Sequence, residues 1–449
     1  MTDPRLLLAD AAARAAAHLA GLDDRAVFPP PEAVAALAEL DVALPTVGRD
    51  PHDVLAELDR LGGPATVASP GGRYFGFVTG GAHPVGVGAA WLASAWDQNA
   101  AMAAMSPVAA ALDRVAGRWI TELLGLPVGA TPTFTAGTSS ANATAMAVAR
   151  DRLLTEAGHD VVADGLFGAP PLRVVVGDAH SSVTKALGLL GLGRDRVVRV
   201  PTDRQGRIVA DELPAPGEPT LIVTQAGNVN TGSSDPFDRI ADHFAGSPHW
   251  IHVDGAFGLW AAAAPERQVL VAGVQRAHSW ATDLHKWLNV TYDSAVAIVR
   301  DAQDLTRTFT VGAAYLANEA TLDPVHRGLD MSQRARAVET WAVLAHLGRD
   351  GVADLVERSC RHAGRLADEL GSAGFTIHNE VVLNQVLVSL EEDGATDALL
   401  VAIPGDGTLW AGGSIWHGRR VIRLSVSGWA TTDDDITRSI AALRRLAGR

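Results

Sequence analysis

Residues 251–256 read Ile-His-Val-Asp-Gly-Ala, and further along the chain residues 283–287 read Asp-Leu-His-Lys-Trp. The first stretch is an apolar run that ends in Asp254, and the second places Lys286 in a polar and aromatic turn. Lysine is rare in this chain of 449 residues, which contains only Lys185 and Lys286 and uses arginine for its other basic side chains. Codon bias would explain that rarity equally well, so the position of Lys286 matters more than its scarcity.

Asp254 and Lys286 are the residue types that pyridoxal 5′-phosphate chemistry needs. A lysine amine can form a Schiff base with the cofactor's aldehyde, which an arginine cannot do. A carboxylate can keep the pyridine nitrogen protonated, so that the ring accepts electrons. An unpaired aspartate at the end of a buried strand is costly, and a cationic ring would compensate it. Two ordinary roles stay open: an aspartate that caps a turn, and a lysine on a solvated loop.

The composition indicates a folded globular protein, since 47% of the residues are hydrophobic and 20% are charged. A formal net charge of −14 argues against nucleic acid and anionic membranes as partners. The single Cys360 excludes a disulfide within the chain and a multi-cysteine zinc site. The N-terminus does not resemble a signal peptide, and no uncharged apolar run has the length of a membrane span. We therefore expect a cytoplasmic protein without a metal site.

The apolar pattern changes along the chain and predicts an α/β fold. From about residue 131, short segments that are apolar on both faces alternate with helical stretches, which favours a mostly parallel sheet covered by helices. The candidate strands are 174–176, 197–200, 221–223, 250–253 and 295–299. We expect an N-terminal arm over residues 1–85, a large domain over 86–330, and a smaller α+β domain over 331–449 that begins with a long helix at 333–371.

Candidate binding residues follow the predicted strands in order. Ligands of open α/β sheets bind beyond the carboxyl ends of the strands. The glycine and hydroxyl turn at 134–142 precedes a helix and offers N–H groups and hydroxyls to a phosphate. His180 follows a strand and could stack on a flat cofactor, and the loop at 224–232 offers amide and hydroxyl donors. Each feature alone also fits a helix cap or a loop, but their joint order favours a cofactor site.

Other chemistries lack their motifs. The chain has no phosphate-binding loop of the Gly-x-x-x-x-Gly-Lys type, no His-Glu-x-x-His and no Gly-x-Ser-x-Gly in strand context. His180 and His285 have aspartates nearby in the sequence, but no short cluster of His, Cys and carboxylates supports a metal site.

The stretches 252–258 and 283–287 resemble the group II pyridoxal-phosphate decarboxylases, the family of aromatic-amino-acid, glutamate and histidine decarboxylases. The resemblance runs from about Tyr74 to about Thr432. It implies the aminotransferase-like fold of type I pyridoxal-phosphate enzymes. That fold has a seven-stranded large domain, a small C-terminal domain and an N-terminal arm that interlocks a homodimer.

The same resemblance implies a role for each site residue. Lys286 would form the Schiff base, Asp254 would hold the ring nitrogen, and His180 would stack on the ring. Ala256 would pack on the opposite ring face, and Thr231 would contact the side of the ring hydroxyl. The phosphate would be held by Thr138, Ser139, Ser140 and His285.

For the amino-acid substrate, the resemblance points to two regions. The segment 74–79 resembles an aromatic segment that lines the family's substrate pocket, and it contains Phe75 and Phe77. Arg423 matches an arginine that engages the substrate carboxylate in some members, although an outward-facing arginine on an edge strand explains it equally well.

One stretch departs from the family pattern. Authentic decarboxylases carry a tyrosine in a mobile loop, and this tyrosine protonates the carbon that loses carbon dioxide. The corresponding stretch here, about Leu316 to Arg334, has no tyrosine; Tyr315 precedes it and His326 is its one obvious proton carrier. Relatives without the loop tyrosine can make an aldehyde instead. We therefore expect decarboxylation of an L-amino acid to its amine, with an aldehyde synthase, an aminotransferase or a cofactor-binding protein without turnover as alternatives.

Overall fold

The computed structural model describes residues 3–310 and 323–449. The chain divides into two compact units, and each is described by itself. The large unit comprises Ala82–Arg361 and Asn379–Gln385. The small unit comprises Met1–Gly81, His362–His378 and Val386–Arg449.

The large unit is built on a seven-stranded sheet with the strand order β1-β7-β6-β5-β4-β2-β3. β7 is antiparallel to both of its neighbours, whereas the other neighbouring strands run parallel. This arrangement confirms the predicted α/β fold with a mostly parallel seven-stranded sheet. The strands are β1 (Thr131–Thr135), β2 (Arg173–Val176), β3 (Val198–Arg199), β4 (Thr220–Gln225), β5 (His249–Asp254), β6 (Ser279–Asp283) and β7 (Ala295–Val299).

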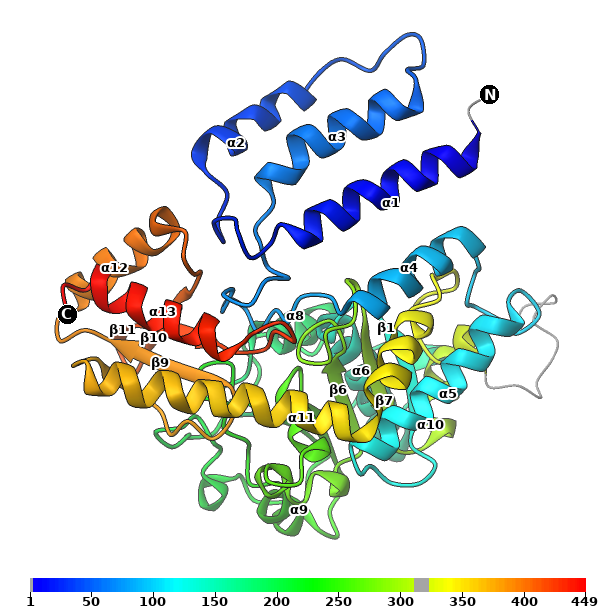
Figure 1. Ribbon diagram of the computed structural model, residues 1–449. Coiled ribbons are helices and arrows are strands. Elements are labelled where there is room, and N and C mark those ends of the chain that lie inside the picture. The colour runs from blue at the N-terminus through cyan, green and yellow to red at the C-terminus, as the bar shows by residue number, and fades with distance from the viewer. Residues whose placement is uncertain (1–2, 311–322) are drawn as a thin grey trace. The chain divides into compact units, whose positions relative to one another are not determined.

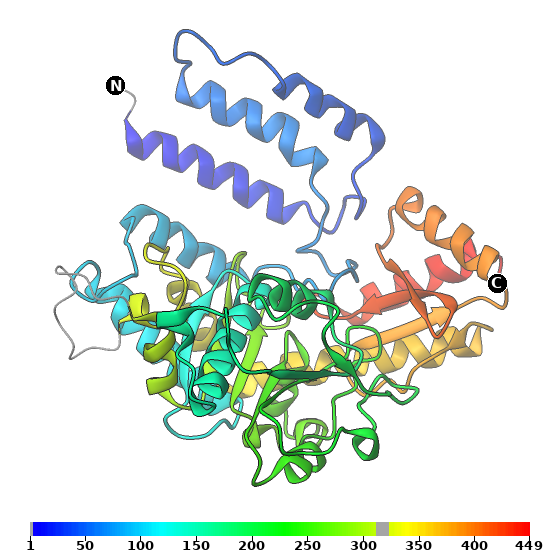
Figure 2. The ribbon, with the colours of Figure 1, turned by 180° about the vertical axis from the view of Figure 1, so that it is seen from behind.

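Helices of the large unit enclose this sheet, as the two opposite views show (Figures 1 and 2). α6 packs across β1, β4, β5, β6 and β7. Its apolar side chains, among them Met146 and Leu153, form a core with strand residues such as Val176 and Leu221. The helices are α4 (Pro84–Trp96), α5 (Pro107–Leu123), α6 (Thr138–Glu156), α7 (Val161–Asp164), α8 (Ser181–Leu189), α9 (Phe237–Phe244), α10 (Ala302–Phe309) and the first part of α11 (Ala337–Ser372). Short 3-10 turns are η2 (Ala210–Glu212), η3 (Gly258–Ala263), η4 (Gln268–Val271), η5 (Val274–Arg276) and η6 (Pro324–His326).

Residues 279–283, which were not among the strands predicted from the sequence, form the buried strand β6 between β5 and β7. Burial of the polar side chains in this strand is tolerated because neighbouring residues supply hydrogen-bond partners. The hydroxyl of Ser279 bonds to Trp250 and His252, and the indole N–H of Trp280 donates to the carbonyl of Val274.

The small unit combines three N-terminal helices with a four-stranded sheet of order β10-β11-β9-β8. A buried Arg73 joins the two parts of the chain, since it donates to the carbonyl of Thr408 and pairs with Asp435. The elements are α1 (Pro4–Ala20), α2 (Pro31–Ala36), η1 (Leu37–Leu40), α3 (Pro51–Ala65), β8 (Thr376–Ile377), β9 (Gln385–Ser389), α12 (Asp393–Asp406), β10 (Gly412–Trp416), β11 (Arg419–Ser425) and α13 (Asp433–Leu446). The predicted long helix at 333–371 is α11, which is interrupted at Gly348, where φ is 62°.

Candidate active site

Two aspartates end neighbouring strands of the large unit beside Lys286. Asp254 is the last residue of β5 and Asp283 is the last residue of β6. These strands are parallel, with Asp254 paired to Ala281, so both carboxylates lie at the same edge of the sheet. The Nζ atom of Lys286 lies 2.9 Å from Oδ2 of Asp283. The structure thus brings together the predicted aspartate, the predicted lysine and a second carboxylate.

The pKa values of the two carboxyls move in opposite directions. Burial raises the pKa of Asp254, and the attraction of His180 and Lys286 opposes that rise without overcoming it. Burial would also raise the pKa of Asp283, but the charges of Lys286 and His285 and hydrogen bonds from Lys286 and Thr138 outweigh it and lower that pKa. Asp283 therefore has its cation within the protein, whereas the charged form of Asp254 would gain from a further cation.

The turn before α6 is arranged to receive an anion. α6 starts at Thr138, whose N–H donates to Oδ1 of Asp283 over 2.6 Å. The hydroxyl oxygen of Thr138 is buried and has no hydrogen-bond partner. Ser139 is exposed and Ser140 is partly buried. A hydroxyl without a partner at the positive end of a helix can donate to a phosphate oxygen.

The imidazole of His285 is held by contacts with Ser294, Asp283 and Tyr292. Its Nδ1 accepts the N–H of Ser294 over 3.1 Å, which leaves the hydrogen of the neutral ring on Nε2. Nε2 lies 3.6 Å from Oδ1 of Asp283, and the ring stacks on Tyr292 with centroids 4.2 Å apart. Burial lowers the pKa of His285.

His180 precedes α8, and its Nδ1 accepts the N–H of Ser182. Its ring is exposed and borders an open hollow of about 650 Å³, together with Ser139, Lys185 and Arg194. Lys185 is exposed on α8, as expected of a surface lysine. The two lysines differ in burial: Lys286 is mostly buried beside the strand ends, whereas Lys185 is exposed on α8.

Ala256 and Thr231 also lie in the large unit. Ala256 is partly buried just after β5, and its N–H donates to Oδ1 of Asp254. Thr231 donates its hydroxyl hydrogen to the carbonyl of Gln205 over 2.6 Å and accepts the N–H of Ser233. The hydroxyl of Thr231 is therefore engaged within its own loop, and its contact with a ring hydroxyl stays a prediction.

The predicted substrate residues Phe75, Phe77 and Arg423 belong to the small unit, where Phe75 and Phe77 contact Trp410 and Arg423 lies on β11. The N–H of Phe75 donates to the carbonyl of Trp410, and the carbonyl of Phe75 accepts the N–H of Ser425. The rings of Phe77 and Trp410 lie 5.2 Å apart, and Arg423 pairs in the sheet with Gly412. Phe75 is fully buried, Phe77 is exposed, and burial lowers the pKa of Arg423. The sequence did not point to Trp410.

Sequence reasoning missed the roles of three residues: Asp283 at the end of β6, Asn142 in α6 and His252 within β5. Asn142 donates to Oδ2 of Asp254 over 3.1 Å, and His252 contacts the side-chain oxygen of Asn142. The signal for Asp283 was present, because it ends a strand as Asp254 does, but it required the recognition of β6. Asn142 and His252 gave no signal, since their contacts join separate elements.

Of the stretch 316–334 that departs from the family pattern, residues 316–322 lie outside the described residues, and so does Tyr315 before it. His326 is described and lies in η6. Its neighbour Arg327 donates to the carbonyl of Pro132, and the hydroxyl of Thr133 donates to the carbonyl of Arg327. His326 is therefore next to the first half of β1.

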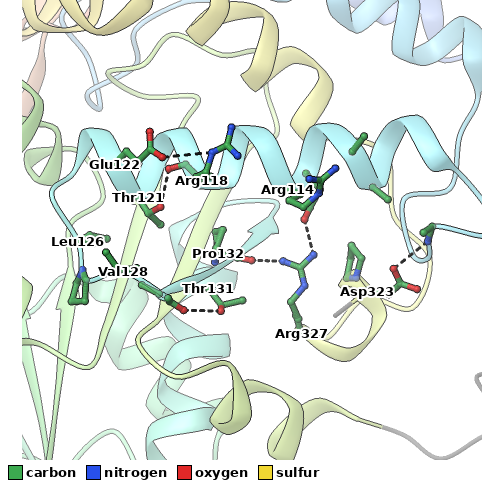
Figure 3. Close-up of a pocket in the computed structure, with 18 of the residues that line it drawn as sticks. Arg114, Arg118, Thr121, Glu122, Leu126, Val128, Thr131, Pro132, Asp323 and Arg327 are labelled. Carbon is green, nitrogen blue, oxygen red and sulfur yellow. Dashed lines mark hydrogen bonds and ion pairs between the residues drawn. The ribbon is translucent and has the colours of Figure 1, made fainter. Parts of the chain in front are cut away.

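A cavity of about 800 Å³ in the large unit lies away from Lys286 (Figure 3). Arg327 borders it and reaches toward α5, where it pairs with Asp113 at 2.6 Å. The cavity surrounds Thr131 at the start of β1, which pairs with Val299, whereas the lysine follows the opposite end of the sheet.

Within the described ranges, no helix is long and apolar enough to cross a membrane. Residues 3–310 and 323–449 also contain no group of three or more His, Cys, Asp or Glu side chains that could hold a metal ion.

Comparisons with known proteins agree with this geometry. The family model of the pyridoxal-dependent decarboxylase conserved domain matches residues 37–391. An aromatic-L-amino-acid decarboxylase of Bacillus atrophaeus is 27% identical over 349 residues, which cover 75% of this chain and 70% of that protein. An L-2,4-diaminobutyrate decarboxylase of Rhizobium meliloti is 27% identical over 373 residues, which cover 78% of this chain and 72% of that protein.

Among solved structures, Oryza sativa TDC with PLP and tryptamine has the same fold, with a TM-score of 0.91 and 21% identity over 100% of this chain and 99% of that chain. The family resemblance predicted from residues 252–258 and 283–287 is thereby confirmed. The chain belongs to the pyridoxal-dependent decarboxylases, enzymes whose cofactor is pyridoxal 5′-phosphate.

Proposed function

We propose that this enzyme decarboxylates an L-amino acid to its amine and that Lys286 is the point of covalent attachment for the cofactor. The observation that carries the proposal is the meeting of Lys286 with two strand-end carboxylates, Asp254 and Asp283, beside the start of α6. When bound, pyridoxal 5′-phosphate supplies an electron sink for the bond that breaks.

The residues present fit that cofactor on two observations. The buried hydroxyl of Thr138 lacks a partner at the start of a 19-residue helix, which suits a phosphate oxygen. The buried carboxyl of Asp254 has a raised pKa, so its charged form gains from a cation such as a protonated ring nitrogen. We therefore assign the phosphate to Thr138, Ser139, Ser140 and His285.

Each side chain would then have a separate task. The charge of Asp254 would favour a proton on the ring nitrogen, and His180 and Ala256 would contact the ring. Asp283 holds the ammonium group of Lys286 and anchors the first N–H of α6. The family resemblance assigns Phe75, Phe77 and Arg423 to the substrate, and this assignment stays a prediction. Arginine suits a carboxylate because its planar group donates two parallel hydrogen bonds.

Two other outcomes on the same site stay open as alternatives, an aldehyde synthase and an aminotransferase. They are favoured by the missing tyrosine in the stretch 316–334, because the carbon that loses carbon dioxide then lacks its usual proton donor. A cofactor-binding protein without turnover is the third alternative, and the retained Lys286 argues against it.

A panel of amino acids tests these outcomes together. The cofactor-loaded protein is supplied with aromatic, acidic and basic amino acids, and carbon dioxide, amine, aldehyde, peroxide and ammonia are measured. We expect carbon dioxide and amine in equal amounts, with no activity in Lys286→Ala and full activity in Lys185→Ala. Equal amounts of aldehyde and peroxide would instead favour the aldehyde synthase, and turnover by Lys286→Ala at the normal rate would refute the proposal.

We also propose that the enzyme works as a homodimer in which residues 1–85 form an arm. Support comes from α4, which contains no charged residue and exposes Trp91, Leu92 and Trp96 on one face. Exposed apolar faces of this kind mark protein contacts.

The cytoplasmic location stays a prediction of the sequence.

A further inference from the structure

A buried series of hydrogen bonds connects the indole of Trp250 on β5 with the carboxylate of Asp254 at the end of the same strand. The indole N–H of Trp250 meets the hydroxyl oxygen of Ser279 at 2.8 Å, and that hydroxyl meets Nδ1 of His252 at 2.9 Å. Nε2 of His252 meets Oδ1 of Asn142 at 2.9 Å, and Nδ2 of Asn142 meets Oδ2 of Asp254 at 3.1 Å. Asn142, His252 and Ser279 are fully buried, so water does not compete for these bonds.

The direction of these hydrogen bonds is fixed at the Trp250 end, because an indole N–H can only donate. With Trp250 donating to Ser279, the serine hydrogen goes to Nδ1 of His252, the histidine hydrogen goes from Nε2 to Asn142, and the amide hydrogen goes to Asp254. Every donor then has an acceptor, and His252 is neutral, in agreement with burial that lowers its pKa to about 3.

The reversed arrangement leaves a donor without an acceptor. A protonated Asp254 would donate to Oδ1 of a rotated Asn142, whose amide would donate to Nε2 of His252. The hydrogen on Nδ1 would then point at Ser279, which already accepts from Trp250. The hydroxyl hydrogen of Ser279 would be left buried without an acceptor, which is costly. The hydrogen bonds therefore place a donor against Oδ2 of Asp254, and donation to a carboxylate favours its ionised form.

We propose that Asn142 is a positioning residue. Because its Oδ1 accepts from His252, its amide N–H must donate to Asp254, and this donation keeps the carboxylate ionised for the cofactor's ring nitrogen. Its second amide hydrogen faces the hydroxyl of Ser182 at 3.4 Å, and that hydroxyl contacts Nδ1 of His180 at 2.9 Å. The amide of Asn142 thus links Asp254, which is assigned to the ring nitrogen, with His180, which is assigned to the ring face. The proposal rests on the assignment of Asp254 to the ring nitrogen.

The first test uses the cofactor-free protein and needs no variant. The nitrogen-15 signals of His252 report which ring nitrogen carries the hydrogen. We expect a neutral ring with its hydrogen on Nε2 from about pH 5 to pH 8. A hydrogen on Nδ1, or a ring that becomes charged in this range, would overturn the proposal. Since no cofactor or substrate is present, this result is independent of the reaction that the enzyme performs.

The second test compares Asn142→Leu with Thr144→Val, a matched change on the same helix. Thr144 is as buried as Asn142, and its hydroxyl has no partner. We expect Asn142→Leu to bind pyridoxal 5′-phosphate about tenfold more weakly, since a hydrogen bond to a charged group is lost. The pH at which the absorbance of the bound cofactor changes should also shift in Asn142→Leu but stay unchanged in Thr144→Val.

His180, Lys286 and Asp283, the other charged or titratable groups that act on Asp254, are the same in both proteins. Normal cofactor affinity and an unchanged absorbance profile in Asn142→Leu would overturn the proposal. If that variant does not fold, the His252 measurement decides alone.

Discussion

At the scale of single residues, the ion pair between Lys286 and Asp283 should be measurable in the cofactor-free enzyme. Both side chains are mostly buried, so removal of one partner leaves the other charge without compensation. In a cycle of Lys286→Ala, Asp283→Asn and the double variant, we expect a coupling energy of about 1–3 kcal/mol at neutral pH. Because the pKa of Asp283 is lowered, this coupling is present above its ordinary range and is lost as the pH falls below about 4. Urea unfolding of the four proteins measures it, and additive effects would contradict the pairing.

His252 should make the stability of the enzyme depend on pH. Burial lowers the pKa of His252 from 6.5 to about 3. Below pH 6.5, this histidine is therefore protonated in the unfolded chain but stays neutral in the native chain. Its contribution to stability is present above about pH 6.5 and decreases by about 1.4 kcal/mol per pH unit as the pH falls toward 3. We expect His252→Gln to lose this dependence, as shown by urea unfolding at several pH values.

The comparison between variants is needed because Asp235 acts in the opposite sense. Burial raises its pKa to about 7, so the native chain holds a proton that the unfolded chain releases at lower pH. Asp235 therefore offsets part of the dependence that His252 and His278 give the wild-type enzyme, since burial also lowers the pKa of His278 to about 3. Thr144→Val should keep the full dependence, and an identical slope in His252→Gln would contradict the buried neutral histidine.

At the scale of elements, the start of α6 should contribute to cofactor affinity through Thr138. Thr138→Val keeps the shape of the side chain and removes the hydroxyl that has no partner within the protein. We expect the dissociation constant of pyridoxal 5′-phosphate to rise about tenfold, since a charge-assisted hydrogen bond is lost. Thr144→Val serves as the control, because that hydroxyl also has no partner but lies in the interior of the same helix. Equal affinity of both variants would contradict a phosphate at this turn.

Close packing after β5 should make Gly258 sensitive to substitution. A Cβ at this position would come within 2.5 Å of the backbone at Ala226 and Gly227. We expect Gly258→Ala to destabilise the enzyme by about 1–3 kcal/mol, because backbone cannot move aside as a flexible side chain can. Gly364→Ala in α11 meets nothing within 4 Å and should stabilise by about 0.5–1 kcal/mol. Thermal unfolding separates the two, and a neutral Gly258→Ala would contradict the contact.

The sequence predicted elements where the pattern was simple and failed where polar groups are buried. The strands around 174–176, 221–223, 250–253 and 295–299 were predicted because both of their faces are apolar. β6 was missed since Ser279, Thr282 and Asp283 look like turn residues, and only their partners on other elements make them compatible with burial. The break at Gly348 was also missed, because glycine inside a helical pattern is often tolerated.

Some residues of the candidate site could be predicted from the sequence and others could not. Lys286 and Asp254 were predicted from local order along the chain. Asn142, His252 and Asp283 act through contacts between α6, β5 and β6, which are far apart in sequence. Pairings of this kind become visible only once the register of β5 and β6 is known.

At the scale of the whole molecule, the exposed face of α4 should hold two copies together. Trp91, Leu92 and Trp96 are 46%, 53% and 43% exposed and lie on the same side of the helix. We expect Trp91→Arg to weaken the dimer, as measured by sedimentation at several protein concentrations. Phe167→Arg is the control, because Phe167 is 97% exposed in a loop of the same unit. A variant Trp91→Arg that sediments as the wild-type enzyme does would exclude α4 from the interface.

The attachment of the cofactor to Lys286 is the centre of the account, and the chain offers a direct test of it. Only two lysines are present, one mostly buried beside the strand ends and one exposed on α8. The cofactor-loaded enzyme is treated with borohydride, which makes the linkage permanent, and the labelled peptide is identified by mass spectrometry. The account predicts one cofactor per chain, carried by the peptide with Lys286. Label on Lys185, or no label on either lysine while the cofactor stays bound, would contradict it.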